Sequence, residues 1–275
     1  MGMRAFVLRR NPPPTMHYKM AAPATGNPRF ERVDAFRGLA MVWMTFYHFS
    51  FDLNHFGYIH QNFYDDPRWT LQRAAIVSLF LLAAGMGQAI AVEQGQSWPR
   101  FWRRWAQVAG CALLVSLGSW WMFRERYIYF GVLHGMAAML LITRGLLLRG
   151  WLTAGRGIAW GGVLIALPFV VPHVLAGGAP VWLTDLLNSR WLNWLGLVTH
   201  KPPTEDYVPL LPWLGVMLWG ASVAQWLLAK RPGVLAGASA GGLAKLGRWS
   251  LSYYMLHQPV LIGAFTVVAA LRHPA

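Results

Sequence analysis

The stretch that decides the fold is VDAFRGLAMVWMTFYHF, residues 33–49. Its apolar length fits a membrane-spanning helix, which needs about 20 predominantly apolar residues. On a helix, with about 100° per residue, Asp34, Arg37, His48, Asp52 and His55 lie on one face, and Arg37 and His48 are about 16 Å apart along the axis. Ionisable groups inside a membrane are costly and usually face a cavity or the bundle interior. This face is therefore predicted to point inward.

The rest of the chain is equally apolar. Its 275 residues are 56% hydrophobic and 12% charged, whereas soluble domains carry about 25% charged residues. We therefore predict an all-α, polytopic membrane helix bundle. Seven stretches are candidates to span the membrane: 35–57, 70–92, 104–123, 127–148, 157–176, 207–229 and 249–271.

Two segments depart from this pattern. Pro168 and Pro172 predict that the fifth helix is kinked or shortened, because proline removes a backbone hydrogen bond. The Trp-rich segment 181–196 is too short to span comfortably and is predicted to be an interfacial helix. Residues 1–30 contain no apolar run long enough for a signal peptide and are predicted to be a disordered cytoplasmic tail, with Met1 or Met20 as the true start. Residues 31–275 form the predicted transmembrane domain.

The net charge of +14 is spread between the apolar segments rather than gathered in one basic domain, so nucleic acid is not a predicted partner. With the N-terminus inside, seventeen of the 24 Lys and Arg residues fall in the tail and the inside connections. The positive-inside rule then predicts an N-in, C-out topology. The single cysteine, Cys111, excludes an intramolecular disulfide.

The polar face of the first helix suggests a site. Asp34 and Arg37 are either an interfacial ion pair or part of an anion site at the inner mouth. His48 is either an interhelical hydrogen-bond partner or a general base, since its ordinary pKa lies near neutrality. Asp52, one turn later, is placed to orient the imidazole of His48.

Other candidates lie further along the chain. His55, His60, Asp65 and Asp66 form a polar cluster after the first helix, but their spacing matches no metal motif, so no metal is predicted. His134 is expected near the depth of His48, either as a second candidate for the catalytic base or as part of an interhelical hydrogen bond. For Gly85 and Gly87 close helix packing is the favoured interpretation.

Two later segments contribute polar residues. Asp206 is predicted to cap the sixth helix and, with Trp213, to contact the acceptor substrate. Arg248, His257 and Gln258 enter from the inner side and are candidates for cofactor binding. Arg103, Arg104 and Arg248 either pair with phosphates or serve topology alone.

Several motifs together resemble the heparan-α-glucosaminide N-acetyltransferase catalytic-domain family, one of a wider set of multi-helix membrane acyltransferases. They are DAFRGLAMVWM at 34–44, the small-residue turn at 85–87, GVLH at 131–134, YVPLLPWLG at 207–215 and LHQP at 256–259. The resemblance runs from residue 33 to about residue 262.

The resemblance implies transfer of an acetyl or other acyl group from cytoplasmic acetyl-CoA or acyl-CoA to a sugar amine or hydroxyl on the far side. The family's Asp and Arg match Asp34 and Arg37. In lysosomal members the active His lies in the loop after the first helix, but no ungapped match fixes it here, so His48, His55 and His60 compete. The chain lacks the large lumenal domain of those members, which leaves the acceptor open.

The preferred interpretation is thus a bacterial inner-membrane acyltransferase involved in glycan modification, surrounded by lipids, with a homo-oligomer among the possible states. The alternative is a transporter or channel for a small polar solute or proton, with the polar face lining its path. Transporters often carry inverted repeats, and the sequence shows none. A purely structural membrane protein is disfavoured by the number of histidines at membrane depth.

Overall fold

The computed structural model describes residues 30–236 and 241–272, and within them the chain is helical without strands. The long helices are α1 (Glu31–His55), α2 (Pro67–Glu93), α3 (Trp98–Met122), α4 (Val132–Leu148), α5 (Ala154–Ala176), α7 (Leu210–Lys230) and α10 (Ser250–Arg272). The short ones are α6 (Val181–Asn188), α8 (Pro232–Ala236), α9 (Gly241–Arg248) and the 3-10 turns η1 (Arg124–Arg126) and η2 (Asn193–Leu195). The predicted all-α fold is confirmed, and each of the seven apolar stretches overlaps a long helix.

Four of these helices are long and apolar enough to cross a membrane: α2, α5, α7 and α10. The α4 helix is equally apolar but has only 17 residues, or roughly 25 Å of axis. The α1 and α3 helices have 25 residues each and carry charges near their starts. Most of the predicted tail, residues 1–29, and the C-terminal residues 273–275 lie outside the described part of the chain.

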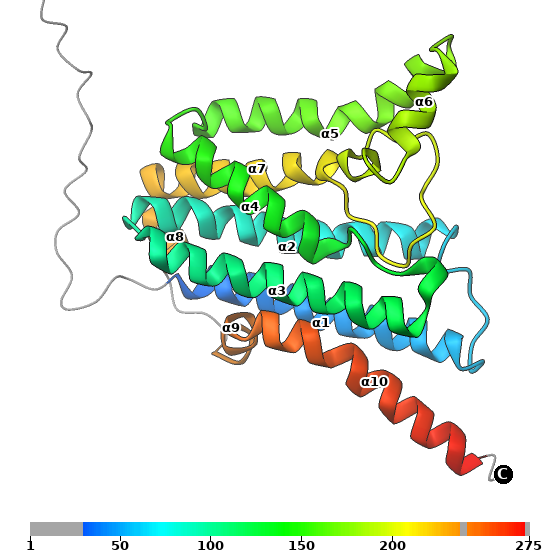
Figure 1. Ribbon diagram of the computed structural model, residues 1–275. Helices are drawn as coiled ribbons and strands as arrows, with labels where there is room; N and C mark the ends of the chain where they lie inside the picture. The colour runs from blue at the N-terminus through cyan, green and yellow to red at the C-terminus, as the bar shows by residue number, and fades with distance from the viewer. Residues whose placement is uncertain (1–29, 237–240, 273–275) are drawn as a thin grey trace, which may run out of the picture.

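The α2 helix is central, since it packs against α1, α4 and α7, and α7 in turn packs against α5 (Figure 1). Glycines permit these close approaches. A Cβ on Gly85 would overlap the Met217 carbonyl oxygen of α7, and one on Gly220 would overlap the Leu82 carbonyl of α2. The packing interpretation of Gly85 therefore agrees with the structure.

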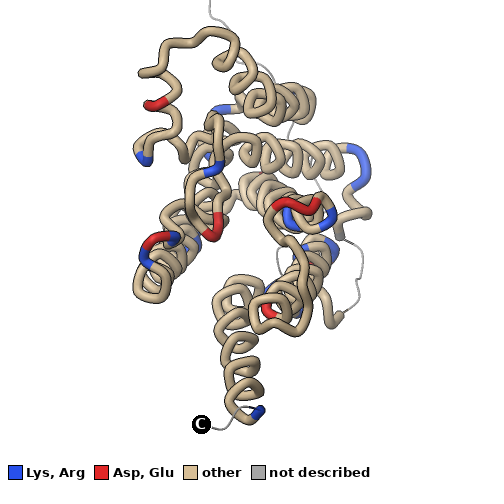
Figure 2. Tube along the Cα trace, turned by 90° about the vertical axis from the view of Figure 1, so that its right-hand side faces the viewer, with Lys and Arg blue, Asp and Glu red and all other residues tan. Residues whose placement is uncertain are grey.

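The bundle has two ends, which we call near and far. At the near end lie the start of α1, the α2–α3 turn, α8 and α9, and at the far end lie the α1–α2 loop, η1 and the loop before α7 (Figure 1). Viewed onto the far end, charged residues gather at helix ends and connections (Figure 2). The α10 helix packs against α1, and its C-terminal half diverges from the bundle in Figure 1.

Two expected helix starts were wrong. The α4 helix starts at Val132 rather than 127, because its N-cap is Gly131 in extended conformation. The sixth spanning stretch becomes helical only at Leu210, after Pro209 as N-cap. The α5 helix, expected to be kinked or shortened, continues through Pro168 and Pro172 to Ala176, so the shortening did not occur. The segment 181–196 divides into α6 and η2 rather than forming one helix.

Candidate functional site

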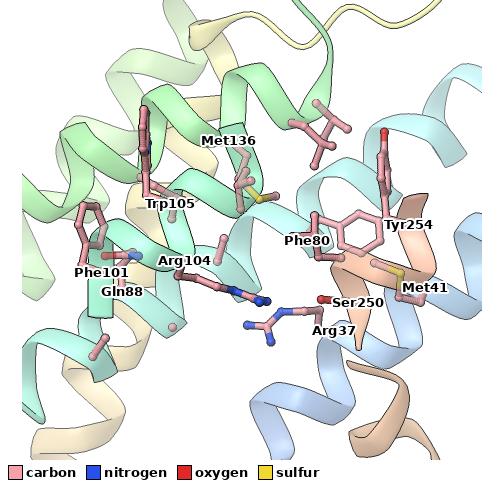
Figure 3. Close-up of a pocket in the computed structure, with 18 of the residues that line it drawn as sticks. Arg37, Met41, Phe80, Gln88, Phe101, Arg104, Trp105, Met136, Ser250 and Tyr254 are labelled. Carbon is pink, nitrogen blue, oxygen red and sulfur yellow. The ribbon is translucent and has the colours of Figure 1, made fainter. Parts of the chain in front are cut away.

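A cavity of about 240 Å³ lies inside the bundle toward the near end, with walls from α1, α2, α3, α4 and α10. Arg37 of α1 and Arg104 of α3 line it, and their guanidinium groups approach each other in Figure 3. The rest of the wall is largely apolar and aromatic, from Met41, Phe80, Phe101, Trp105, Met136 and Tyr254, with Ser250 at the start of α10. Two cations in a mainly apolar hollow give it a positive electrostatic character.

Local contacts hold Arg37 at the cavity. Its Nη1 donates to Asp34 Oδ1 at 3.2 Å, one turn earlier on α1, and to the Gly247 carbonyl of α9 at 3.5 Å. The ion pair with Asp34 offsets the positive charge of Arg37. The charge of Arg104 therefore makes the cavity positive overall.

Two residues of α2 complete this region. The Oε1 of Gln88, which lines the cavity, is buried and has no hydrogen-bond partner among the described residues. Gly87 also faces the cavity, because a Cβ there would meet only Arg37 Nη2, at 3.6 Å. The packing interpretation therefore suits Gly85 and not Gly87.

A second cluster joins α1 to α10 further along α1. His48 Nδ1 lies 2.7 Å from Gln258 Oε1 and 3.0 Å from His257 Nε2. Gln258 Nε2 donates to Asp52 Oδ1 at 2.7 Å, and Asp52 is 2% exposed. Asp52 therefore reaches His48 through the Gln258 amide rather than by the direct contact that the helical spacing suggested.

The cavity and this cluster adjoin through Tyr254. Tyr254 lines the cavity, and its ring centroid lies 5.7 Å from that of His257. Met41 lines the cavity about two turns before His48 on α1. The structure thus brings together Arg37, His48, Asp52, His257 and Gln258 along one side of the bundle.

His134 belongs to a different network. Its Nδ1 accepts from the Gly131 amide at 3.3 Å, so its Nε2 carries the proton and donates to Ser116 Oγ at 3.0 Å. The Ser116 hydroxyl in turn donates to the Ile128 carbonyl at 2.6 Å. Both ring nitrogens are thereby used in fastening the start of α4 to α3, and the structure does not bring His134 into contact with His48.

The other histidine candidates lie at the far end. His55 is exposed in the last turn of α1. His60 is exposed in the α1–α2 loop and lines a shallow hollow of about 410 Å³ with Asn54, Gln61, Asn62, Phe63 and Tyr64. No group of three metal-ligating side chains occurs within the described residues.

Asp206 caps a helix, but not the predicted one. Its Oδ2 accepts from the Val132 amide at 2.7 Å, so it caps α4, whereas α7 begins without a side-chain cap. Burial raises the pKa of the Asp206 carboxyl, while the Val132 amide, Arg73 and Lys201 oppose the rise.

The last two candidates do not line the cavity. Trp213 is partly buried and packs against apolar residues of the core. Arg248 is exposed at the end of α9 and does not line the cavity.

Sequence reasoning left Arg104 undecided and missed Gln88 and Trp105 as cavity residues. The helical spacing of Phe101, Arg104, Trp105 and Val108 places all four on one face of α3, and all four line the cavity. That face was a usable signal. Nothing in the sequence indicated that Gln88 would lack a partner, because this depends on how α2 is rotated against its neighbours.

Comparison with known proteins identifies the family of the chain. The model of the family described as heparan-alpha-glucosaminide N-acetyltransferase, catalytic, matches residues 29–259, which include every residue of the cavity and of the histidine cluster. No curated protein and no solved structure shows significant similarity to the chain. The family match covers most of the chain, and the protein belongs to the heparan-alpha-glucosaminide N-acetyltransferase catalytic-domain family.

Proposed function

We propose that this membrane protein transfers an acyl group from acyl-CoA, taken up at the near end, to a sugar amine or hydroxyl at the far end. Family membership supports the transferase class. The observation that carries the finer proposal is the cavity with Arg37 and Arg104, which adjoins the His48 cluster through Tyr254.

The donor is proposed to bind with its phosphates toward Arg37 and Arg104, because arginines recognise phosphate with several donors at once. Complete sites for drug-sized ligands measure roughly 300–1,000 Å³, and this cavity measures about 240 Å³. It therefore matches only part of a CoA molecule. The diphosphate and the start of the pantetheine arm suit it, with the nucleotide outside at the near end.

The base is proposed to be His48. Both of its hydrogen-bond contacts to described residues use Nδ1, which leaves Nε2 to receive a proton. As the acceptor nitrogen or oxygen bonds to the thioester carbonyl carbon, its proton passes to His48 Nε2. The carbon–sulfur bond then breaks, and the departing thiolate takes up a proton.

The proposed reaction requires one orientation of the helix bundle in the membrane. A cytoplasmic donor at the near end requires the start of α1 inside, and seven crossings by α1–α5, α7 and α10 then put the C-terminus outside. The proposed location is the bacterial inner membrane, with lipids around the bundle. The far-end hollow lined by His60, Asn54 and Tyr64 is open to an acceptor sugar.

The test is titration of the detergent-solubilised protein with CoA and acetyl-CoA by calorimetry. Binding with a dissociation constant between about 1 μM and 1 mM is expected. Arg104→Gln is expected to weaken it at least tenfold, since a charge-assisted contact contributes about 1.5–3 kcal/mol. Arg103→Gln is the matched control, because Arg103 is exposed and does not line the cavity.

Two outcomes contradict the proposal. Absence of CoA binding would exclude acyl-CoA as the donor and would favour the transporter interpretation instead. Equal losses from Arg104→Gln and Arg103→Gln place the phosphates elsewhere.

A further inference from the structure

The contacts of His257 define where its protons lie. Its Nδ1 is 2.7 Å from the Tyr254 carbonyl oxygen, and its Nε2 is 3.0 Å from His48 Nδ1. A carbonyl oxygen only accepts, so Nδ1 of His257 carries a hydrogen. A neutral His257 then presents the lone pair of Nε2 to His48.

The tautomer of His48 follows from this. Nδ1 of His48 must donate, because the lone pair of His257 Nε2 faces it at 3.0 Å. Gln258 Oε1, at 2.7 Å, is a second acceptor for the same hydrogen, and the Gln258 amide is oriented by its bond to Asp52. The proton of neutral His48 is thus held on Nδ1, and the lone pair is held on Nε2.

We propose that His257 is a positioning residue that also accepts a proton, so that His48 and His257 work as a pair. The inference rests on the proposed function, with His48 as base. When His48 Nε2 takes the proton of the acceptor, the Nδ1 proton of His48 moves to His257 Nε2. The positive charge then resides on His257, whose Nδ1 hydrogen stays bonded to the Tyr254 carbonyl. When the thiolate leaves, it takes a proton from His48 Nε2, and the Nδ1 proton returns from His257.

The surroundings of the pair suit a shared proton. Tyr253 stacks on His257 with a ring separation of 6.0 Å and an interplanar angle of 8°, and its hydroxyl is fixed 2.6 Å from Thr45 Oγ1. Tyr47 lies beside His48 and Tyr254 beside His257. The carboxylate in this hydrogen-bond network is Asp52, which is bonded to the Gln258 amide. His55 is a further titratable group that interacts with Asp52.

A structural alternative assigns His257 only the task of joining α10 to α1. His257→Gln separates the two roles, because a glutamine places Oε1 where it can still accept from His48 Nδ1 but cannot take up a proton. His257→Asn is the companion variant, since its Nδ2 can still donate to the Tyr254 carbonyl. The companion keeps the test open if the glutamine variant does not fold.

The experiment measures acetyl transfer in mixtures of H₂O and D₂O. In the wild type, two protons in motion predict a curved dependence of kcat on the deuterium fraction. In His257→Gln we expect CoA affinity within about twofold of the wild type, a kcat lower by about 10- to 100-fold, as when a partner that orients a functional histidine is removed, and a linear dependence. In His257→Asn we expect the same linear dependence.

The outcomes separate this inference from the proposed function. A wild type that binds no CoA and transfers no acyl group overturns both. A wild type that transfers, with a linear dependence of its own, overturns the proton pair alone. So does a folded His257 variant that keeps the curved dependence or a kcat within about threefold of the wild type.

Discussion

Three histidines near the end of α1 compete for the role of base, and their surroundings differ. His48 is linked through its Nδ1 to Gln258 and His257, whereas His55 and His60 are exposed at the far end. We expect His48→Gln to lower kcat by about 10²–10⁴, the usual contribution of a general base, with CoA binding retained. His55→Gln serves as the control in the same acetyl-transfer assay and should stay within about threefold of the wild type, because His55 is exposed at the far end and lines neither the cavity nor the far-end hollow. Full activity of His48→Gln would move the base to another residue.

We expect Asp206 to make the stability of the folded protein depend on pH. Burial raises the pKa of its carboxyl in the folded protein, so folding favours the protonated form. Its stabilising contribution is present below the ordinary pKa of Asp and is lost as the pH rises through the raised value. Asp206→Asn stays neutral and keeps an oxygen to accept from the Val132 amide.

We therefore expect the Tm of Asp206→Asn, relative to the wild type, to be higher at pH 8 than at pH 4. Asp206→Leu removes the acceptor and should lower the Tm at both pH values. A Tm difference for Asp206→Asn that does not change with pH would contradict the assignment.

For single residues, the sequence predicted which side chains share a face better than it predicted which of them form hydrogen bonds. Helical periodicity placed Arg37, His48 and Asp52 on one face of α1, and the structure keeps them on one side of the bundle. The role of Gln258 as the link between Asp52 and His48 was not predictable, because it depends on the register of α10 against α1. For the same reason the hydrogen bond between His134 and Ser116 of α3 was not predictable from the sequence.

Among the elements, α2 carries two glycines that differ in function although they lie only two residues apart. Gly85 faces α7, where any Cβ overlaps the Met217 carbonyl, whereas Gly87 faces the cavity and Arg37. Gly85→Ala is therefore expected to destabilise the fold by about 1–3 kcal/mol, as overpacking does. Gly87→Ala should be tolerated, since its Cβ would lie at 3.6 Å from Arg37 Nη2, an ordinary contact.

Gly87→Leu extends this comparison to the donor. A leucine there fills the space beside Arg37 without removing either arginine, so CoA affinity should fall at least tenfold while the Tm stays near that of Gly87→Ala. Calorimetry and thermal unfolding check the two expectations. Unchanged CoA affinity in a folded Gly87→Leu protein would show that the donor does not use this cavity.

Element boundaries show where sequence patterns stop being informative. Residues 127–131 are apolar and continue the hydrophobic stretch of α4, yet they are not helical, because Gly131 is the extended N-cap and Asp206 supplies the acceptor for Val132. Asp206 lies 74 residues beyond Val132. A cap supplied from so far along the chain leaves no local signal.

For the whole molecule, the sequence predicted the helical class and the positions of the long helices because hydrophobic length is a local property. It did not predict the cavity, which depends on five helices meeting. Hydrophobic length alone does not give the number of crossings or their direction. Among the described helices, α2, α5, α7 and α10 are long and apolar enough to cross a membrane, whereas α1 and α3 carry charges near their starts. The predicted seven crossings and N-in orientation therefore depend also on the charge distribution. These two features are open to a direct experiment.

Cysteine accessibility tests the topology as a whole. In a Cys111→Ser background, the proposed N-in arrangement with seven crossings puts Ser97→Cys and Arg149→Cys inside and Asp65→Cys and Glu125→Cys outside. All four positions are exposed at helix ends or connections. A membrane-impermeant maleimide should therefore label residues 65 and 125 in intact spheroplasts and residues 97 and 149 only after permeabilisation.

Residues 97 and 125 flank α3, so labelling of both from the same side would mean that α3 does not cross. Labelling of 97 and 149 alone in intact spheroplasts would invert the bundle, and a cytoplasmic donor would then have no route to Arg37 and Arg104.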